Sequence, residues 1–201
     1  MRQFHKTQKD TKKYQFEQSN GKTHFVVVMT FICMLFIPIL IKLFYSSSAT
    51  PTTVIQLPNE LGLSTIAALC STWLLHYAEV FKKNDNHRKF RLTLVMINVT
   101  GWLFLGLQSL AWKDINAIAD PAVASIATLM GAIIVLHAFH FVIAAGLLLF
   151  SLIRVAGVRT SADLYIFFLN PGRAKFFEAG CKFWNYLVLL WTGMYAVMLL
   201  R

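Results

Sequence analysis

The stretch that decides the fold is PAVASIATLMGAIIVLHAFHFVIAAGLLLFSLI, residues 121–153, which contains no Asp, Glu, Lys or Arg. A helix that crosses a bilayer needs about 20 mostly apolar residues, because each residue rises about 1.5 Å and the hydrocarbon is about 30 Å thick. As one helix this stretch would be about 50 Å long, so we expect it to project beyond the bilayer on the Asp120 side. The stretch predicts a membrane protein.

The composition of the whole chain agrees with that prediction. Of its 201 residues, 57% are hydrophobic and 14% are charged, whereas a soluble domain carries roughly 25% charged residues. Apolar runs long enough to cross a bilayer predict five spans, at residues 25–45, 61–81, 92–112, 121–153 and 177–200. We therefore expect an all-α fold in which residues 25–201 form a bundle of five transmembrane helices. A polar, basic tail over residues 1–24 precedes it.

The positions of the basic residues predict how the helices cross the membrane. The formal net charge is +10, and Lys and Arg concentrate before the first span, between the second and third, and between the fourth and fifth. Because such a bias marks the cytoplasmic side, the N-terminus is expected inside and the C-terminus outside. The same distribution accounts for the basic charge near lipid headgroups, so no nucleic-acid partner is expected.

Two histidines lie within the fourth span. A spacing of three places His137 and His140 on one helical face, where they could bind a metal, a heme or a partner helix. A metal site usually needs further ligands, and none follows at helical spacing, so interhelical hydrogen bonding is the preferred interpretation. Trp184 and Asn185 in the last span lie at about the same depth in the membrane as His140, so we expect a hydrogen-bond network between them and the histidines. No catalytic, cofactor-binding or metal site is predicted in the chain.

Two helix starts and one ion pair are also predicted. Asp120–Pro121 and Asn170–Pro171 each place a capping side chain before a proline suited to the first helical turn. Glu178 lies four residues before Lys182, so the two are expected to neutralise each other near the inner interface.

Polar residues in the second span have two interpretations. They could line an ion path, or their hydroxyls could hydrogen-bond across packed helices, and we prefer the second. The two ionisable residues, His76 and Glu79, lie near the basic headgroup region, where charge is tolerated. The series is Thr65, Ser71, Thr72, His76 and Glu79.

Polar and aromatic residues recur in a definite order along the last four spans. They are Ser64, Thr65, Ser71 and Ala78; then Gly101, Phe104 and Gln108; then His137 and His140; and finally Glu178, Trp184, Trp191 and Tyr195. In this order and spacing, from about Pro58 to Tyr195, the chain resembles subunit III of the heme-copper oxidases, in the short five-helix form of bacterial terminal oxidases.

The chain departs from the pattern of that family at several positions. The first span contains none of the carboxylates usual there, and Ala111 stands where a glutamate would follow Gln108. In the last span Lys182, Asn185 and Val188 replace an aromatic, a histidine and an aspartate. The chain looks like a divergent member.

The resemblance implies an accessory, non-redox subunit of an aerobic respiratory terminal oxidase in the bacterial cytoplasmic membrane. It implies no cofactor in this chain and no active site of its own. Heme and copper are expected in subunits I and II, its partners, which oxidise cytochrome c or quinol, reduce oxygen and pump protons, and which could join a larger respiratory supercomplex. The family's subunit III is associated with bound phospholipid, with oxygen access and with sustained proton uptake.

Two other functions compete with this one. The chain could be a membrane b-type cytochrome whose heme is ligated by His76, His137 or His140. It could also be a small transporter, because of the polar series in the second span, although it lacks an inverted repeat or paired broken helices.

Overall fold

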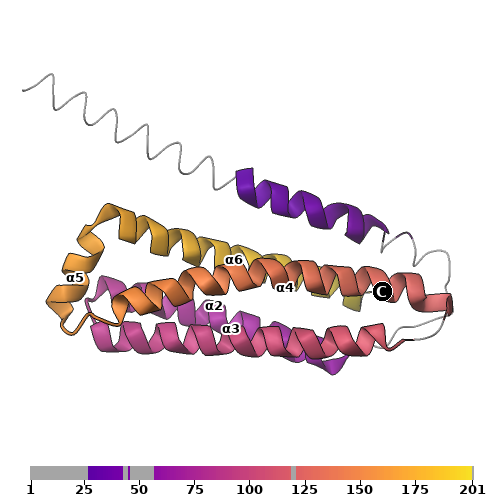
Figure 1. Ribbon diagram of the computed structural model, residues 1–201, viewed down its shortest axis with the longest axis horizontal. Helices are drawn as coiled ribbons and strands as arrows, with labels where there is room; N and C mark the ends of the chain where they lie inside the picture. Colours follow the sequence, from indigo (N-terminus) through magenta and orange to yellow (C-terminus); the bar gives the residue numbers. More distant parts are fainter. Residues whose placement is uncertain (1–26, 43–44, 46–56, 119–120, 201) are drawn as a thin grey trace, which may run out of the picture. The chain divides into compact units, whose positions relative to one another are not determined.

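A computed structural model of the chain (Figure 1) describes residues 27–42, 45, 57–118 and 121–200. Within these residues the fold is all-α, as predicted, with six helices. They are Val27–Lys42, α2 (Asn59–Lys83), α3 (His87–Asn116), α4 (Pro121–Val155), α5 (Ser161–Leu169) and α6 (Pro171–Leu199). The chain divides into two compact units, Met1–Pro38 and Ile39–Arg201.

The first unit contains most of the helix Val27–Lys42. This helix is apolar, but it is shorter than the about 20 residues that cross a bilayer. The predicted first span, 25–45, includes residues 25–26 and 43–44, which lie outside the described residues, as does the predicted tail over 1–24. The first span therefore stays a prediction.

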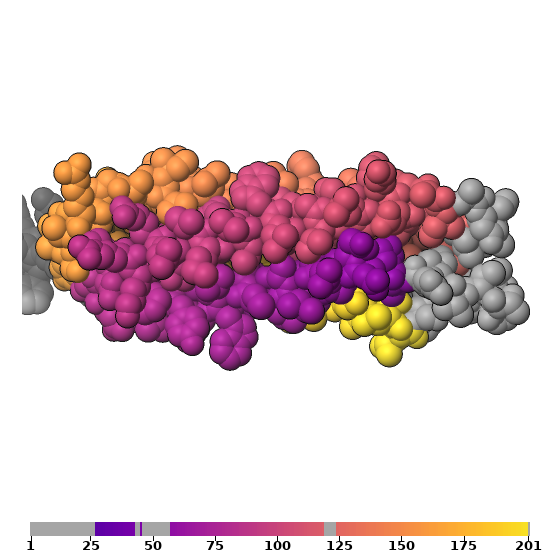
Figure 2. Space-filling model, turned by 90° about the horizontal axis from the view of Figure 1, so that it is seen from below, coloured from indigo at the N-terminus to yellow at the C-terminus, as the bar shows by residue number. Residues whose placement is uncertain are grey.

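The second unit is a ring of four long helices. α2 packs against α3 and α6, and α4 packs against the same two helices. α2 and α3 lie side by side along the face drawn in Figure 2. Two hydrogen bonds show that α6 runs antiparallel to α2, because Trp184 bonds Ser71 whereas Trp191, further along α6, bonds the earlier Thr65.

Three helices of this unit are long and apolar enough to cross a membrane, namely α2, α3 and residues Ala124–Val155 of α4. Large apolar side chains point outward from them, including Trp73, Val99 and Phe139, which are 60–70% exposed. An outward apolar surface of this extent suits lipid rather than water. These helices suggest a multi-pass membrane protein.

Helix α6 has 29 residues, which is long enough to cross a bilayer. Its first half carries Arg173, Lys175, Glu178 and Lys182, so its apolar part begins at Phe183. The helix itself begins at Pro171, six residues before the predicted span. Asn170 caps it as expected, with its side-chain oxygen accepting the amide N–H groups of Gly172 and Arg173 at 3.0 and 3.4 Å.

A three-residue turn joins α2 to α3. Asp85 adopts a φ of 50°, which Asp tolerates better than most residues because its short side chain is compatible with the left-handed region. Asn86 then caps α3, with its side-chain oxygen accepting the amide N–H of Lys89 at 3.2 Å. The turn brings the basic residues at the end of α2 and the start of α3 to the same end of the unit.

The short helix α5 was not predicted from the sequence. It begins with a capping box, in which the Thr160 hydroxyl accepts the Asp163 amide and the Asp163 carboxylate accepts the Thr160 amide. The Thr160 side chain and then its amide hold the pKa of Asp163 below its usual value. Thr160-x-x-Asp163 was the sequence signal that could have revealed this helix.

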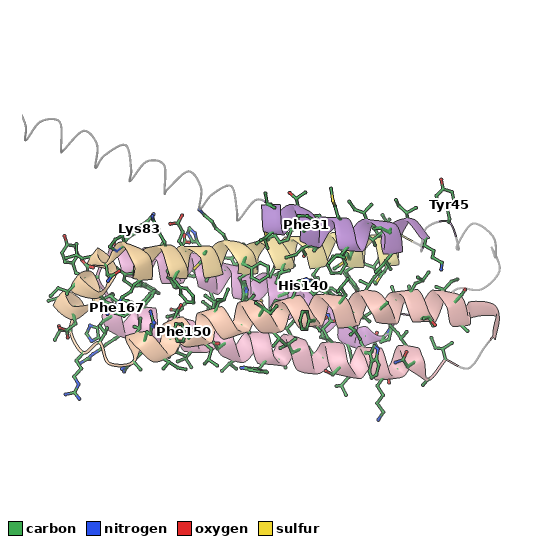
Figure 3. The ribbon with its side chains drawn as sticks, turned by 45° about the horizontal axis from the view of Figure 1, so that its top comes forward. Phe31, Tyr45, Lys83, His140, Phe150 and Phe167 are labelled. Carbon is green, nitrogen blue, oxygen red and sulfur yellow. The ribbon has the colours of Figure 1, made fainter. Side chains whose placement is uncertain are left out.

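Aromatic rings and basic side chains fill the end of the unit where α5 lies. The ammonium group of Lys82 lies 4.5 Å from the Phe168 ring and 5.2 Å from the Phe177 ring, and Phe90 packs edge-on against both rings. In Figure 3, Lys83, Phe150 and Phe167 lie toward this end, whereas His140 lies nearer the middle of α4. The loops between α2 and α3 and between α4 and α6 thus form one basic end.

At Gly101 the side chain of Trp184 on α6 packs against the backbone of α3. A Cβ atom added there would lie 2.6 Å from Cη2 of Trp184, an indole that is fully buried and hydrogen-bonded. Because the indole is buried and hydrogen-bonded, a side chain at this position would require the ring or α3 to shift. Gly106, the next glycine of α3, is exposed and has no atom within 4 Å of an added Cβ.

We predict that Gly101→Ala lowers the free energy of unfolding in mixed micelles by about 1–3 kcal/mol, because the added methyl group overpacks the interface. Gly106→Ala is the matched control, and it is expected to be neutral or slightly stabilising since alanine favours a helix. Equal stability of the two variants, measured by denaturant titration of the purified protein, would contradict the close packing of Trp184 on α3.

Candidate functional site

The candidate site is a buried layer of polar and aromatic side chains, contributed by α2, α3, α4 and α6. Its best-defined contacts join α6 to α2. The indole N–H of Trp184 donates to Oγ of Ser71 at 2.8 Å, and the indole N–H of Trp191 donates to Oγ1 of Thr65 at 2.9 Å. All four side chains are buried. We call this cluster the indole layer. It consists of these four residues together with Ser64, Gly101, Phe104, Gln108, His137 and Phe141, whose contacts are described in the next paragraphs.

The hydroxyl groups of Thr65 and Ser71 on α2 each act both as acceptor and as donor. Thr65 donates its hydroxyl proton to the Leu61 carbonyl at 2.8 Å, and Ser71 donates to the Ala68 carbonyl. The lone pairs of each hydroxyl then receive the indole. This arrangement satisfies these two hydroxyl groups and both indole N–H groups without water.

Helix α3 joins the layer through Gln108. Its side-chain Nε2 donates to Oγ of Ser64 at 3.0 Å, and Ser64 in turn donates to the Leu61 carbonyl at 2.8 Å. The Oε1 atom of Gln108 is buried and has no hydrogen-bond partner among the described residues. Ala111, one turn further along α3, is fully buried, so this position faces the interior.

Helix α4 contributes His137, whose side chain is fully buried among aromatic rings. Its ring centroid lies 5.0 Å from that of Trp191, 5.9 Å from Phe104 and 6.1 Å from Phe141. Phe141 also packs 4.5 Å from Trp184. The imidazole is thus part of the same layer as the two indoles.

The predicted network between the histidines and the Trp184–Asn185 pair differs from the one observed. Trp184 donates to Ser71 instead, and Asn185 lies on the exposed side of α6. His140 directs Nδ1 at the Leu136 carbonyl of its own helix, at 2.7 Å, so Nδ1 is the protonated nitrogen. The depth estimate placed Asn185 at the right level but on the wrong face of the helix.

The other sequence-predicted residues lie at or outside the edges of the layer. Tyr195 is half-buried, and its hydroxyl lies 3.1 Å from where a Cβ on Gly62 would be. Glu178 and Lys182 form the predicted ion pair at 2.6 Å, with both side chains more than half exposed. The predicted pairing is confirmed, and such an exposed pair contributes about 0–1 kcal/mol.

The polar series of α2 does not line one path. Thr65 and Ser71 face the indoles, whereas His76 is exposed and packs against the ring of its neighbour Tyr77. The preferred interpretation of the hydroxyls, hydrogen bonding across packed helices, is confirmed for Thr65 and Ser71.

Asn98 is a buried polar residue that the sequence reasoning missed. Asn98 of α3 is 5% exposed, and its Nδ2 donates to the Leu94 carbonyl at 2.9 Å. Its Oδ1 is buried without a hydrogen-bond partner in the described part of the chain. An asparagine in the middle of an apolar run was the available signal.

The geometry does not favour heme or metal ligation by the histidines. Aromatic rings on three sides occupy the space around His137, and His76 points outward from a different helix. Within residues 27–42, 45, 57–118 and 121–200 no three His, Cys, Asp or Glu side chains come together as metal ligands. The arrangement of the layer suits holding four helices together.

No protein-family model matches the chain, and a search of the curated proteins finds no match.

We predict that the bond between Trp191 and Thr65 can be measured as a coupling energy. In a double-mutant cycle, Trp191→Phe and Thr65→Val should be non-additive by about 0.5–2 kcal/mol of unfolding free energy, because each change removes the same hydrogen bond. The control pairs Trp191→Phe with Thr100→Val, since the Thr100 hydroxyl bonds only the Met96 and Ile97 carbonyls of its own helix. Additivity in the first pair would show that the bond contributes nothing.

Proposed function

We propose that this protein is an accessory, non-redox subunit of an aerobic terminal oxidase, equivalent to subunit III of the heme-copper oxidases. In this proposal it lies in the cytoplasmic membrane of a bacterium and packs against subunits I and II. Those subunits carry heme and copper, receive electrons from cytochrome c or quinol, and reduce oxygen.

The observation that carries the proposal is the composition of the indole layer. The residues through which the chain resembles subunit III come from four spans, and many of them meet in one buried contact. Ser64 bonds Gln108, Thr65 bonds Trp191, and His137 packs on Trp191. Ser71 accepts a hydrogen bond from Trp184, whose ring also packs against Gly101. A shared packing arrangement would account for the order and spacing of these residues.

The chemistry of the layer supports a non-redox role. Its polar groups are hydroxyls, one amide, indoles and an imidazole enclosed by rings, and their hydrogen bonds run between helices. Such groups hold helices in register but do not ligate heme or copper as a set. The subunit would then act by stabilising the catalytic subunit and supporting its access to lipid, oxygen and protons.

A further observation supports a protein partner. Helix α6 exposes Asn185 one turn beyond Lys182, at the level of the buried Trp184. An amide facing hydrocarbon at that depth is costly, whereas a neighbouring subunit can satisfy it. The outward face of α6 is accordingly the side on which we place the larger partner.

In the proposed arrangement the chain crosses the membrane five times. The helix Val27–Lys42 and the apolar half of α6 supply the first and last spans. The basic end, with Lys82, Arg91 and Arg154, lies in the cytoplasm, and Lys113 lies outside. The C-terminus is then outside.

Co-purification tests the proposal. The full-length tagged chain, extracted from its native membrane in mild detergent, should bring down a larger heme-containing protein with an oxidase spectrum. Isolation of a stable, heme-free complex would contradict the proposal. A Soret band from the chain expressed alone would favour the b-type cytochrome instead.

A matched pair of variants tests the face used. Asn185→Leu should lower the ratio of heme to tagged chain about tenfold, since a buried polar contact with the partner is lost. Ser109→Ala removes an exposed hydroxyl of α3 that bonds only the Leu105 carbonyl of its own helix, and it should leave the ratio unchanged.

A further inference from the structure

An open groove lies between the start of α3 and the end of α4, at the basic end of the second unit. Its volume is about 650 Å³. Pockets that hold small molecules typically measure about 300–1,000 Å³. In Figure 2 the start of α3 in magenta borders the orange atoms of α4 and α5 at this end. We call it the α3–α4 groove.

Four basic side chains line the charged part of the groove, and acidic side chains do not neutralise them. They are His87, Arg88, Arg91 and Arg159. Among the described residues no carboxylate lies within 4.0 Å of the three guanidinium groups. The nearby carboxylate of Asp163 accepts the amide N–H of Arg159 at 3.3 Å, so it is engaged with backbone. The groove keeps a local excess of positive charge.

Two arginines at the same end lie outside the groove and are held differently. The guanidinium group of Arg154 lies 4.3 Å from the centre of the Phe150 ring, and that of Arg173 lies 4.7 Å from the centre of the Phe167 ring. Within the part of the chain that the structure describes, the three arginines of the groove have no such ring contact. Their N–H groups can bind the oxygens of an anion in pairs.

The number and placement of these arginines favour an anion with several phosphates. His87 lies 3.5 Å, measured from Nδ1, from Oγ of Ser161, which keeps the start of α3 close to the start of α5. Arg88 and Arg159 therefore reach the groove from two different segments. A single phosphate diester would balance only one of the three guanidinium charges, whereas a chain of phosphates can balance all of them.

The rest of the groove is apolar. On α3, Leu92 and Val95 are 62% and 40% exposed, and Leu152 and Ala156 line the groove from α4. Small-molecule sites typically combine such apolar walls with a few charged groups that fix the orientation of the ligand. Every nucleotide base has flat apolar faces that suit such walls. An inorganic phosphate would leave this part of the groove unused.

We propose that the α3–α4 groove binds one soluble nucleoside triphosphate. Its phosphate chain lies against Arg88, Arg91 and Arg159, and its base lies between Leu92 and Leu152. The described residues that line the groove include no carboxylate to hold Mg²⁺, so the site binds the nucleotide without hydrolysing it. The bound nucleotide would act as an effector that joins the start of α3 to the loop before α5.

This inference does not rest on the proposed role in an oxidase. Nucleotide binding is measured on the purified chain, whether or not a heme protein co-purifies, so the two proposals fail separately. In the proposed orientation the basic end lies in the cytoplasm, where a soluble nucleotide can reach the groove.

Isothermal titration calorimetry of the full-length chain in neutral maltoside micelles, with a chelator present, tests the proposal. One ATP should bind per chain, and Arg88→Gln with Arg91→Gln should weaken binding about tenfold or more, since charged hydrogen bonds are lost. The control Lys83→Gln with Lys175→Gln removes the same charge at the same end, outside the groove, and should change binding less than about twofold at physiological salt.

Two competitors distinguish the ligand classes. ATP should bind about fivefold more tightly than tripolyphosphate, because the base adds contact with the apolar walls. Dioleoylphosphatidylglycerol added to the micelles at the ATP concentration should leave ATP bound. If the double arginine variant fails to fold, Arg159→Gln, in the loop before α5, is the second variant and should weaken ATP binding about threefold or more.

Four results would overturn the proposal. Absence of measurable ATP binding at millimolar concentration would show that the groove is not a nucleotide site. Equal losses in the arginine and lysine variants would show only a general attraction to the basic end. Tripolyphosphate binding as tight as that of ATP would show that the base is not recognised. Displacement of ATP by phosphatidylglycerol would assign the charged part of the groove to a lipid headgroup.

Discussion

Trp184 and Trp191 donate their indole N–H groups to Ser71 and Thr65 across the contact between α6 and α2, and all four side chains are buried. In a membrane the hydrophobic effect does not drive one helix against another, because lipid tails are as apolar as the helix surfaces. Polar contacts and close packing must select the arrangement instead. An indole that lost its hydroxyl partner there would bury an unsatisfied donor, so these bonds fix the register between the two helices.

The rest of the layer follows from the positions of the indoles. Trp184 leaves no room for a side chain at Gly101, so α3 presents its backbone to the indole there. Trp191 of α6 and Phe104 of α3 pack against His137, and these contacts position α4 against both helices. Because the four helices alternate in direction, this packing also gathers the loops that carry Arg and Lys at one end. The charge distribution and the interior packing are consequences of one arrangement.

The sequence predicted the helices better than their contacts. Apolar runs located α2, α3 and α4, and Asn170–Pro171 located the start of α6. The depth estimate did not distinguish Trp184 from Asn185, which are adjacent in sequence but point about 100° apart around a helix of 3.6 residues per turn. Which of them faces His137 depends on the rotation of α6, and only the packing of the other helices decides that. Helix α5 escaped prediction because it is short and its signal lies in the Thr160–Asp163 capping box.

The most direct measurement of the central contact is the indole N–H resonance of each tryptophan in ¹⁵N-labelled protein in micelles. The account predicts that Ser71→Ala shifts the Trp184 resonance and that Thr65→Val shifts the Trp191 resonance. The resonances of Trp73, Trp102 and Trp112, which are exposed, should stay in place. If neither buried indole responds to the loss of its hydroxyl, the bonds between α6 and α2 do not exist in the folded protein, and the packing described for the second unit is wrong.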